Sequence, residues 1–113
     1  MSRDDAYLLD ILDAARLAVE YVRGKTREQF LEDVQLQDAV IRRLAIIGEA
    51  ARRVSEPTRR THATLPWRDM IGMRNIVIHE YDDVDPEVVW DAVARDLEPV
   101  IAALEAVFPP PPP

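Results

Sequence analysis

The sequence predicts an all-α fold, an up-and-down bundle of four to five helices, and three observations support this prediction. Apolar residues recur at steps of three and four along most of the chain, which is the period of an amphipathic helix. No stretch alternates apolar and polar residues as a half-buried strand would. No Asn-Gly or Asp-Gly pair is present to form a tight hairpin turn.

The length of 113 residues suits one domain. We assign residues 1–108 to this helical domain, and residues 109–113, all prolines, to an exposed polyproline tail. A domain of this size buries only part of its surface, so a second copy packed against it would add stability.

The first helix is expected over residues 3–23, and Gly24 is a natural stop just past it. The apolar residues of this helix form one stripe: Leu8, Ile11, Leu12, Ala15, Ala18, Val19 and Val22. A short helical turn should follow, with Thr26 as its N-cap and Gln29 three residues later in a capping box.

A long second helix is expected from about Leu36 to Val54, and Pro57 should end it. Its inward stripe is Val40, Leu44, Ile47, Ala51 and Val54. Residues 56–66 are predicted to be a polar connection that Pro66 closes.

The third helix should begin near Trp67 and include residues 72–81, and the last should begin after Asp85, a good N-cap before Pro86. Pro99 is expected to kink or split the last helix near Arg95, because proline lacks the N–H that a helix needs. Its inward residues are Val89, Trp90, Val93, Leu97, Val100, Ile101 and Leu104.

The net charge of −7 argues against loose binding of nucleic acid, but the charge is uneven. Residues 42–74 carry eight arginines and three acids, whereas both flanking segments are acidic. Solvated helix faces are the simpler explanation of this pattern when charge alone is considered. The absence of cysteine excludes disulfides and thiolate metal sites. A charged N-terminus and the lack of a span-length apolar run lead us to expect a cytoplasmic protein with no membrane contact.

The segment "GMRNIVIHEYDD", residues 72–83, contains the candidate functional residues. On a helix, Arg74 falls in the middle of an apolar face, while Asn75 and His79 lie beside that face, one turn apart. A buried guanidinium needs a partner or a wet cleft. One ligand could touch Arg74 and His79 together only in a groove, such as one formed where two bundles meet.

Each of these residues also has a structural explanation. Arg74 could pair with an acid on a neighbouring helix, for which Glu49 is a candidate. His79 could be a boundary histidine, Tyr81 a core aromatic residue, and Asn75 a residue that hydrogen-bonds along its own helix. No spacing of histidines or carboxylates indicates a metal site, and no glycine-rich phosphate loop is present.

An arginine and a histidine without a metal suit the cleavage of RNA. The 2′-hydroxyl of RNA can attack the adjacent phosphate while a histidine moves the proton. The guanidinium can stabilise the charge that develops on the phosphate oxygens.

The motif Arg74-x4-His79-x-Tyr81 resembles that of the HEPN domains and, within them, the HepT-like ribonuclease toxins. Four segments resemble the family in its order, and together they cover nearly the whole chain: "LLDILDAA" near the start, and residues 38–52, 65–81 and 84–104. The polyproline tail lies outside the family pattern.

The resemblance implies a HEPN-like bundle that forms a homodimer, with the two motifs meeting in a shared cleft. It implies metal-independent endoribonuclease activity without a cofactor, with Arg74 and His79 as the catalytic pair and Asn75 as the supporting polar residue. It also implies a partner, an MNT-type nucleotidyltransferase antitoxin, which would transfer AMP to Tyr81 and silence the RNA-cleaving toxin.

A second interpretation stays open, because the chain is small and acidic and its helical pattern is plain. In this interpretation the protein is a non-catalytic HEPN module that binds a nucleotidyltransferase or a nucleotide, and Arg74 anchors a phosphate or a partner's carboxylate.

Overall fold

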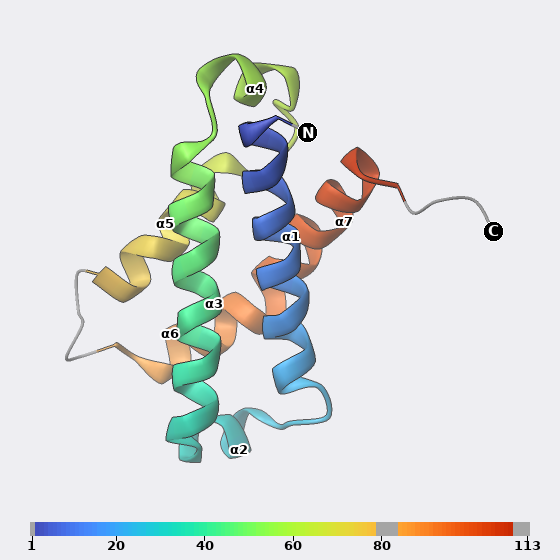
Figure 1. Ribbon diagram of the computed structural model, residues 1–113. Helices are drawn as coiled ribbons and strands as arrows, with labels where there is room; N and C mark the ends of the chain where they lie inside the picture. The colour runs from blue at the N-terminus through green and yellow to red at the C-terminus, as the bar shows by residue number, and fades with distance from the viewer. Residues whose placement is uncertain (1, 79–83, 110–113) are drawn as a thin grey trace.

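The computed structural model describes residues 2–78 and 84–109, and within these ranges every regular element is helical (Figure 1). The predicted all-α fold is therefore confirmed. The helical elements follow in chain order: α1 (Arg3–Val22), α2 (Arg27–Glu32), α3 (Val34–Arg53), α4 (Glu56–Thr61), α5 (Trp67–Ile78), α6 (Pro86–Asp91), the π-helical segment η1 (Ala92–Asp96) and α7 (Leu97–Val107).

Helices α1 and α3 run antiparallel as two long neighbours, and α5 packs on α3 while α7 packs on α1 (Figure 1). The molecule measures 40 × 37 × 20 Å, so its thinnest dimension is about two helix diameters of 10–12 Å. Two layers of helices therefore enclose a single core. No described helix is long and apolar enough to cross a membrane.

The predicted apolar stripes form the core. All five predicted positions of α3 are buried, as are the main positions of α1, whereas Val19 and Val22 at the end of α1 are only partly buried. In the last helix the buried residues include Val89, Val93, Leu97, Val100 and Leu104. Among the described residues no polar or charged residue falls in the buried class, so the core is apolar throughout.

The side chains of two caps fix where α2 and α3 begin. The predicted capping box is present: Thr26 Oγ1 accepts from the Gln29 N–H at 3.1 Å, and Gln29 Oε1 accepts from the Thr26 N–H at 2.9 Å. Asp33 Oδ1 accepts from the Leu36 N–H at 3.0 Å, so α3 begins at Val34 rather than near Leu36 as predicted.

The prediction of a non-helical connection over residues 56–66 is wrong for its first half, which forms α4. Pro57 lies in the first turn of this short helix, where its missing N–H has no intrahelical partner to lose. The proline thus marks a helix start as well as the end of α3. Arg59 of α4 donates to the carbonyl oxygens of Ala51 and Arg52, and so caps the end of α3.

Pro99 splits the last helix as predicted, and the form of the split is the π-helical segment η1. The buried residues Val89, Val93 and Leu97 are four apart, a spacing that drifts around an ideal α-helix. Because a π turn takes up more residues than an α turn, η1 brings these side chains back to the core face.

A carboxylate joins the start of α1 to the start of α4. Asp4 accepts the Ser55 N–H at 3.1 Å, and its second oxygen accepts the hydroxyl groups of Ser55 and Thr58, the latter at 2.6 Å. The hydrogen bonds from the Ser55 and Thr58 hydroxyls lower the pKa of Asp4 from its ordinary value of 3.8.

We expect Asp4→Asn to be less stable than the wild type at pH 7, because the ionised carboxylate is the form these donors stabilise. Since the pKa is lowered on folding, this contribution is present above pH 3.8 and disappears as the pH falls through the folded-state value. Thermal unfolding at pH 7 and near pH 2.5 measures the effect. Asp13→Asn, an exposed position on α1, is the control, and a destabilisation of Asp4→Asn that is independent of pH would contradict the assignment.

Candidate functional site

Helix α5 presents Arg74 toward α3, where its backbone meets Gly48. Among the residues of α5 whose side chains are described, Met70 and Met73 are buried and Trp67 and Ile71 are partly buried against the core. The Arg74 side chain itself remains 26% exposed. Arg74 is therefore within reach of solvent and of a ligand.

A close contact between α3 and α5 fixes where Arg74 lies. A Cβ atom placed on Gly48 would collide first with the Arg74 Cβ, and it would be 2.5 Å from the Arg74 backbone nitrogen and 2.8 Å from its Cα. Only a residue without a Cβ lets the two helix backbones come this close. Gly48 was not among the predicted site residues, although a glycine inside a helical pattern costs stability and so points to a packing or functional reason.

The residue after Gly48 provides the partner of Arg74. Arg74 Nε donates to Glu49 Oε1, so the ion pair considered from the sequence is present. The second carboxylate oxygen of Glu49 lies 3.9 Å from Arg53 Nη2, one turn further along α3. The Glu49 side chain is 40% exposed, so the pair is at the surface rather than inside the core.

The other predicted site residues divide into two groups. Asn75 is exposed and follows Arg74 on α5, as expected for a residue beside the buried face. His79 and Tyr81 lie outside the described residues. The predicted meeting of Arg74 with His79 therefore stays a prediction.

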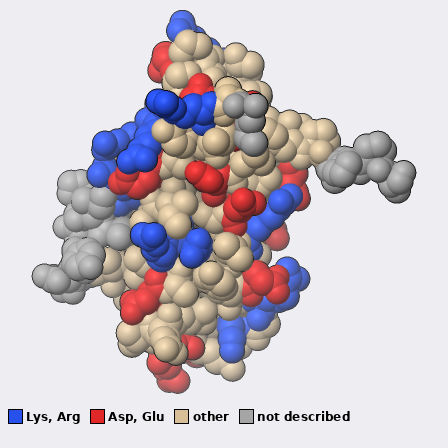
Figure 2. Space-filling view, in the orientation of Figure 1, with Lys and Arg blue, Asp and Glu red and all other residues tan. Residues whose placement is uncertain are grey.

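A shallow groove of about 180 Å³ between α1 and α3 gives solvent access to Glu49. The groove is also lined by Tyr7, Asp10, Arg42 and Arg53. Positively and negatively charged side chains therefore both face it. Figure 2 shows basic side chains gathered over the C-terminal half of α3, with acidic side chains among them. This surface can attract a phosphate group locally although the whole chain is acidic.

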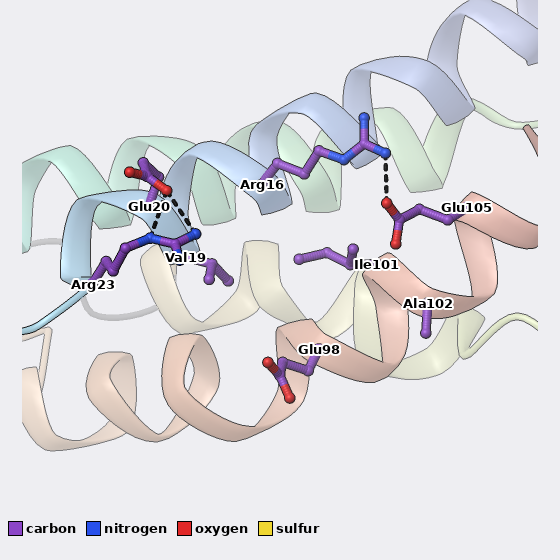
Figure 3. A pocket seen from close by; sticks show the side chains of 8 residues that line it. All are labelled: Arg16, Val19, Glu20, Arg23, Glu98, Ile101, Ala102 and Glu105. Atoms are coloured by element: carbon purple, nitrogen blue, oxygen red, sulfur yellow. Dashed lines mark hydrogen bonds and ion pairs between the residues drawn. The ribbon is translucent and has the colours of Figure 1, made fainter. Parts of the chain in front are cut away.

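A second groove, of about 550 Å³, lies between α1 and α7, away from the predicted site residues (Figure 3). Arg16 and Glu105 pair across it at 2.7 Å, and Arg23 pairs with Glu20 along α1. No group of three potential metal ligands lies together in the described parts of the chain.

The fold and this surface define a small helical domain with an ion-paired, partly exposed arginine. The family model described as "Ribonuclease HepT-like" matches residues 11–107, which includes all of α3 and α5. The chain belongs to this HepT-like family. That membership confirms the resemblance noted from the sequence and supports a ribonuclease function.

Two relatives illustrate the similarity. The chain is 36% identical over 109 residues to MJ1380, a candidate RNase of Methanocaldococcus jannaschii, and the match covers 95% of this chain and all of that protein. It is 44% identical over 91 residues to a protein of Thermococcus cleftensis named "Probable ribonuclease HepT", covering 80% of this chain and 83% of the relative. No solved structure matches the chain.

We expect Gly48→Ala to destabilise the protein by about 1–3 kcal/mol, because the new methyl group would force α3 and α5 apart. Gly72→Ala on α5 is the matched control, since a Cβ there meets no atom within 4 Å. That variant should be more stable by about 0.5–1 kcal/mol, the usual gain for alanine over glycine in a helix. Chemical unfolding of both variants measures the difference, and equal effects would refute the close contact.

Proposed function

We propose that this protein is a metal-independent endoribonuclease and the toxin component of a toxin–antitoxin pair. The observation that carries the proposal is the family match over residues 11–107, which spans the complete Arg74-x4-His79-x-Tyr81 motif. The partly exposed, ion-paired Arg74 supports it, because a guanidinium in this setting can bind a phosphate.

In the proposed reaction the 2′-oxygen of one nucleotide attacks the adjacent phosphorus. The new O2′–P bond forms as the P–O5′ bond breaks, which yields a 2′,3′-cyclic phosphate and a free 5′-hydroxyl. His79 takes part in the proton transfer from the 2′-hydroxyl to the leaving 5′-oxygen. Arg74 stabilises the negative charge on the non-bridging oxygens in the transition state, so no metal is required.

The proposed active form is a homodimer in which the motifs of two copies meet in one cleft. A shared cleft would place Arg74 and His79 on facing walls, where one phosphate could contact both.

The proposed partner is a nucleotidyltransferase of the MNT type, which transfers AMP from ATP to Tyr81. The Tyr81 hydroxyl oxygen attacks the α-phosphorus of ATP and loses its proton, and the bond to the β-phosphate breaks, so that pyrophosphate leaves. The phosphodiester adds a negative charge and a bulky nucleoside two residues from His79. Like-charge repulsion and steric exclusion would then keep RNA out of the cleft.

One observation favours the alternative function, a non-catalytic module that binds a nucleotidyltransferase or a nucleotide. Arg74 is paired with Glu49, as an arginine with a purely structural role would be. In this alternative the arginine anchors a partner's carboxylate or phosphate, and RNA is not cleaved.

We expect the wild-type protein to cleave total RNA in EDTA and to leave cyclic phosphate ends, because neither catalytic residue needs a metal. Arg74→Ala and His79→Ala should each lower the rate by at least about 100-fold, the scale for losing an oxyanion donor or a general acid–base group. Gel analysis of the RNA and chemical analysis of its ends give the result.

Arg68→Ala is the control for the loss of one positive charge from α5, and it should still cleave RNA. Circular dichroism of each variant establishes that the fold is intact. Full cleavage by either motif variant would refute the site. A folded, unmodified and inactive wild type that binds the nucleotidyltransferase would favour the alternative function.

We expect co-expression with the nucleotidyltransferase to increase the mass of the chain by the mass of whole AMP groups and to abolish RNA cleavage. Tyr81→Phe should stay unmodified and active, because phenylalanine lacks the accepting hydroxyl, whereas Tyr21→Phe should behave as the wild type. Intact mass and peptide mapping test this expectation. Modification of Tyr81→Phe at another residue would show that the assigned tyrosine is wrong.

A further inference from the structure

Glu49 contacts Arg74 through one specific nitrogen. The Nε–H of Arg74 is directed at Glu49 Oε1, and Gly48 holds the two helix backbones together one residue before this contact. The α3–α5 packing therefore fixes the distance between the two backbones from which the carboxylate and the guanidinium project.

A bond to Nε leaves most of the guanidinium free. The group is planar and has five N–H donors, of which four are on the terminal nitrogens. An acceptor at Nε fixes the rotation of the plane, and the edge formed by the terminal nitrogens stays open for a bidentate contact with phosphate. The exposed quarter of the Arg74 side chain shows that a ligand can reach this residue.

We propose that Glu49 is a positioning residue for Arg74, holding the guanidinium so that its terminal N–H groups face the scissile phosphate. This inference rests on the proposed ribonuclease function. A carboxylate that is 40% exposed contributes little to stability through such a pair, so its main effect is expected on orientation. The second oxygen of Glu49 lies 3.9 Å from Nη2 of Arg53, which adds only a weak electrostatic attraction.

The test measures cleavage of a defined RNA oligonucleotide by Glu49→Ala and Glu49→Gln. In Glu49→Ala the guanidinium can rotate away, and kcat should fall on the order of 10- to 100-fold, the scale for a misplaced catalytic group. KM should change much less, because the positive charge remains. Glu49→Gln keeps an acceptor oxygen for Nε and should recover most of the lost rate.

Glu105→Ala is the matched control. Glu105 pairs with Arg16 between α7 and α1, and its side chain is 47% exposed, close to the 40% of Glu49 (Figure 3). The control therefore removes an interhelical carboxylate of similar exposure without touching Arg74, and its kcat should equal that of the wild type. The proposal would be overturned if the kcat of Glu49→Ala equalled or exceeded that of the wild type. It would also be overturned if Glu105→Ala lost as much kcat as Glu49→Ala.

A second measurement does not depend on RNA cleavage. In ¹⁵N-labelled protein at pH 6, the Arg74 Nε–H signal, assigned by its loss in Arg74→Lys, should exchange slowly with water in the wild type and in Glu49→Gln. It should exchange rapidly in Glu49→Ala. If the wild type cleaves no RNA, the ribonuclease function fails, and this signal still decides whether Glu49 holds Arg74. An unchanged signal in Glu49→Ala would refute the positioning role.

Discussion

The packing of α3 on two sides is the interaction on which the rest of the structure depends. One face buries Leu44 and Ile47 in the core shared with α1, and Gly48 on a neighbouring face lets α5 lie directly against the helix backbone. Apolar burial provides most of the stability of such a pair of helices. Helix α5 is positioned by this contact, so the location of Arg74 follows from the core of α3.

The candidate site also depends on a balance between burial and charge. A fully buried arginine would lose its hydration, and a fully exposed one would rotate freely in water. At 26% exposure, and paired with Glu49, Arg74 keeps part of its contact with water and has a defined partner. This arrangement fits a group that must recognise a phosphate, and it is also compatible with a structural ion pair, so the distinction depends on chemistry rather than on packing.

Much of this fold could be predicted from the sequence, because the core stripes and the Thr26 capping box depend on local spacing. The start of α3 was misplaced because the Asp33 cap was overlooked, and α4 was missed because Pro57 was considered only as a helix terminator. The candidate pair of Arg74 with Glu49 was predictable from charge. Its geometry depends on the contact of Gly48 with Arg74, and these two residues are far apart in the chain. Helical periodicity carries no information about such tertiary contacts.

The close contact at Gly48 determines which residues the relatives of this protein can have at this position. The atoms that exclude a side chain there are the Cβ, the backbone nitrogen and the Cα of residue 74, which every amino acid except glycine possesses. A relative with another side chain in place of the arginine would still need glycine at the point where α3 and α5 meet. The glycine is therefore a mark of the helix packing, and a relative that retains only the glycine shares this packing without the proposed arginine site.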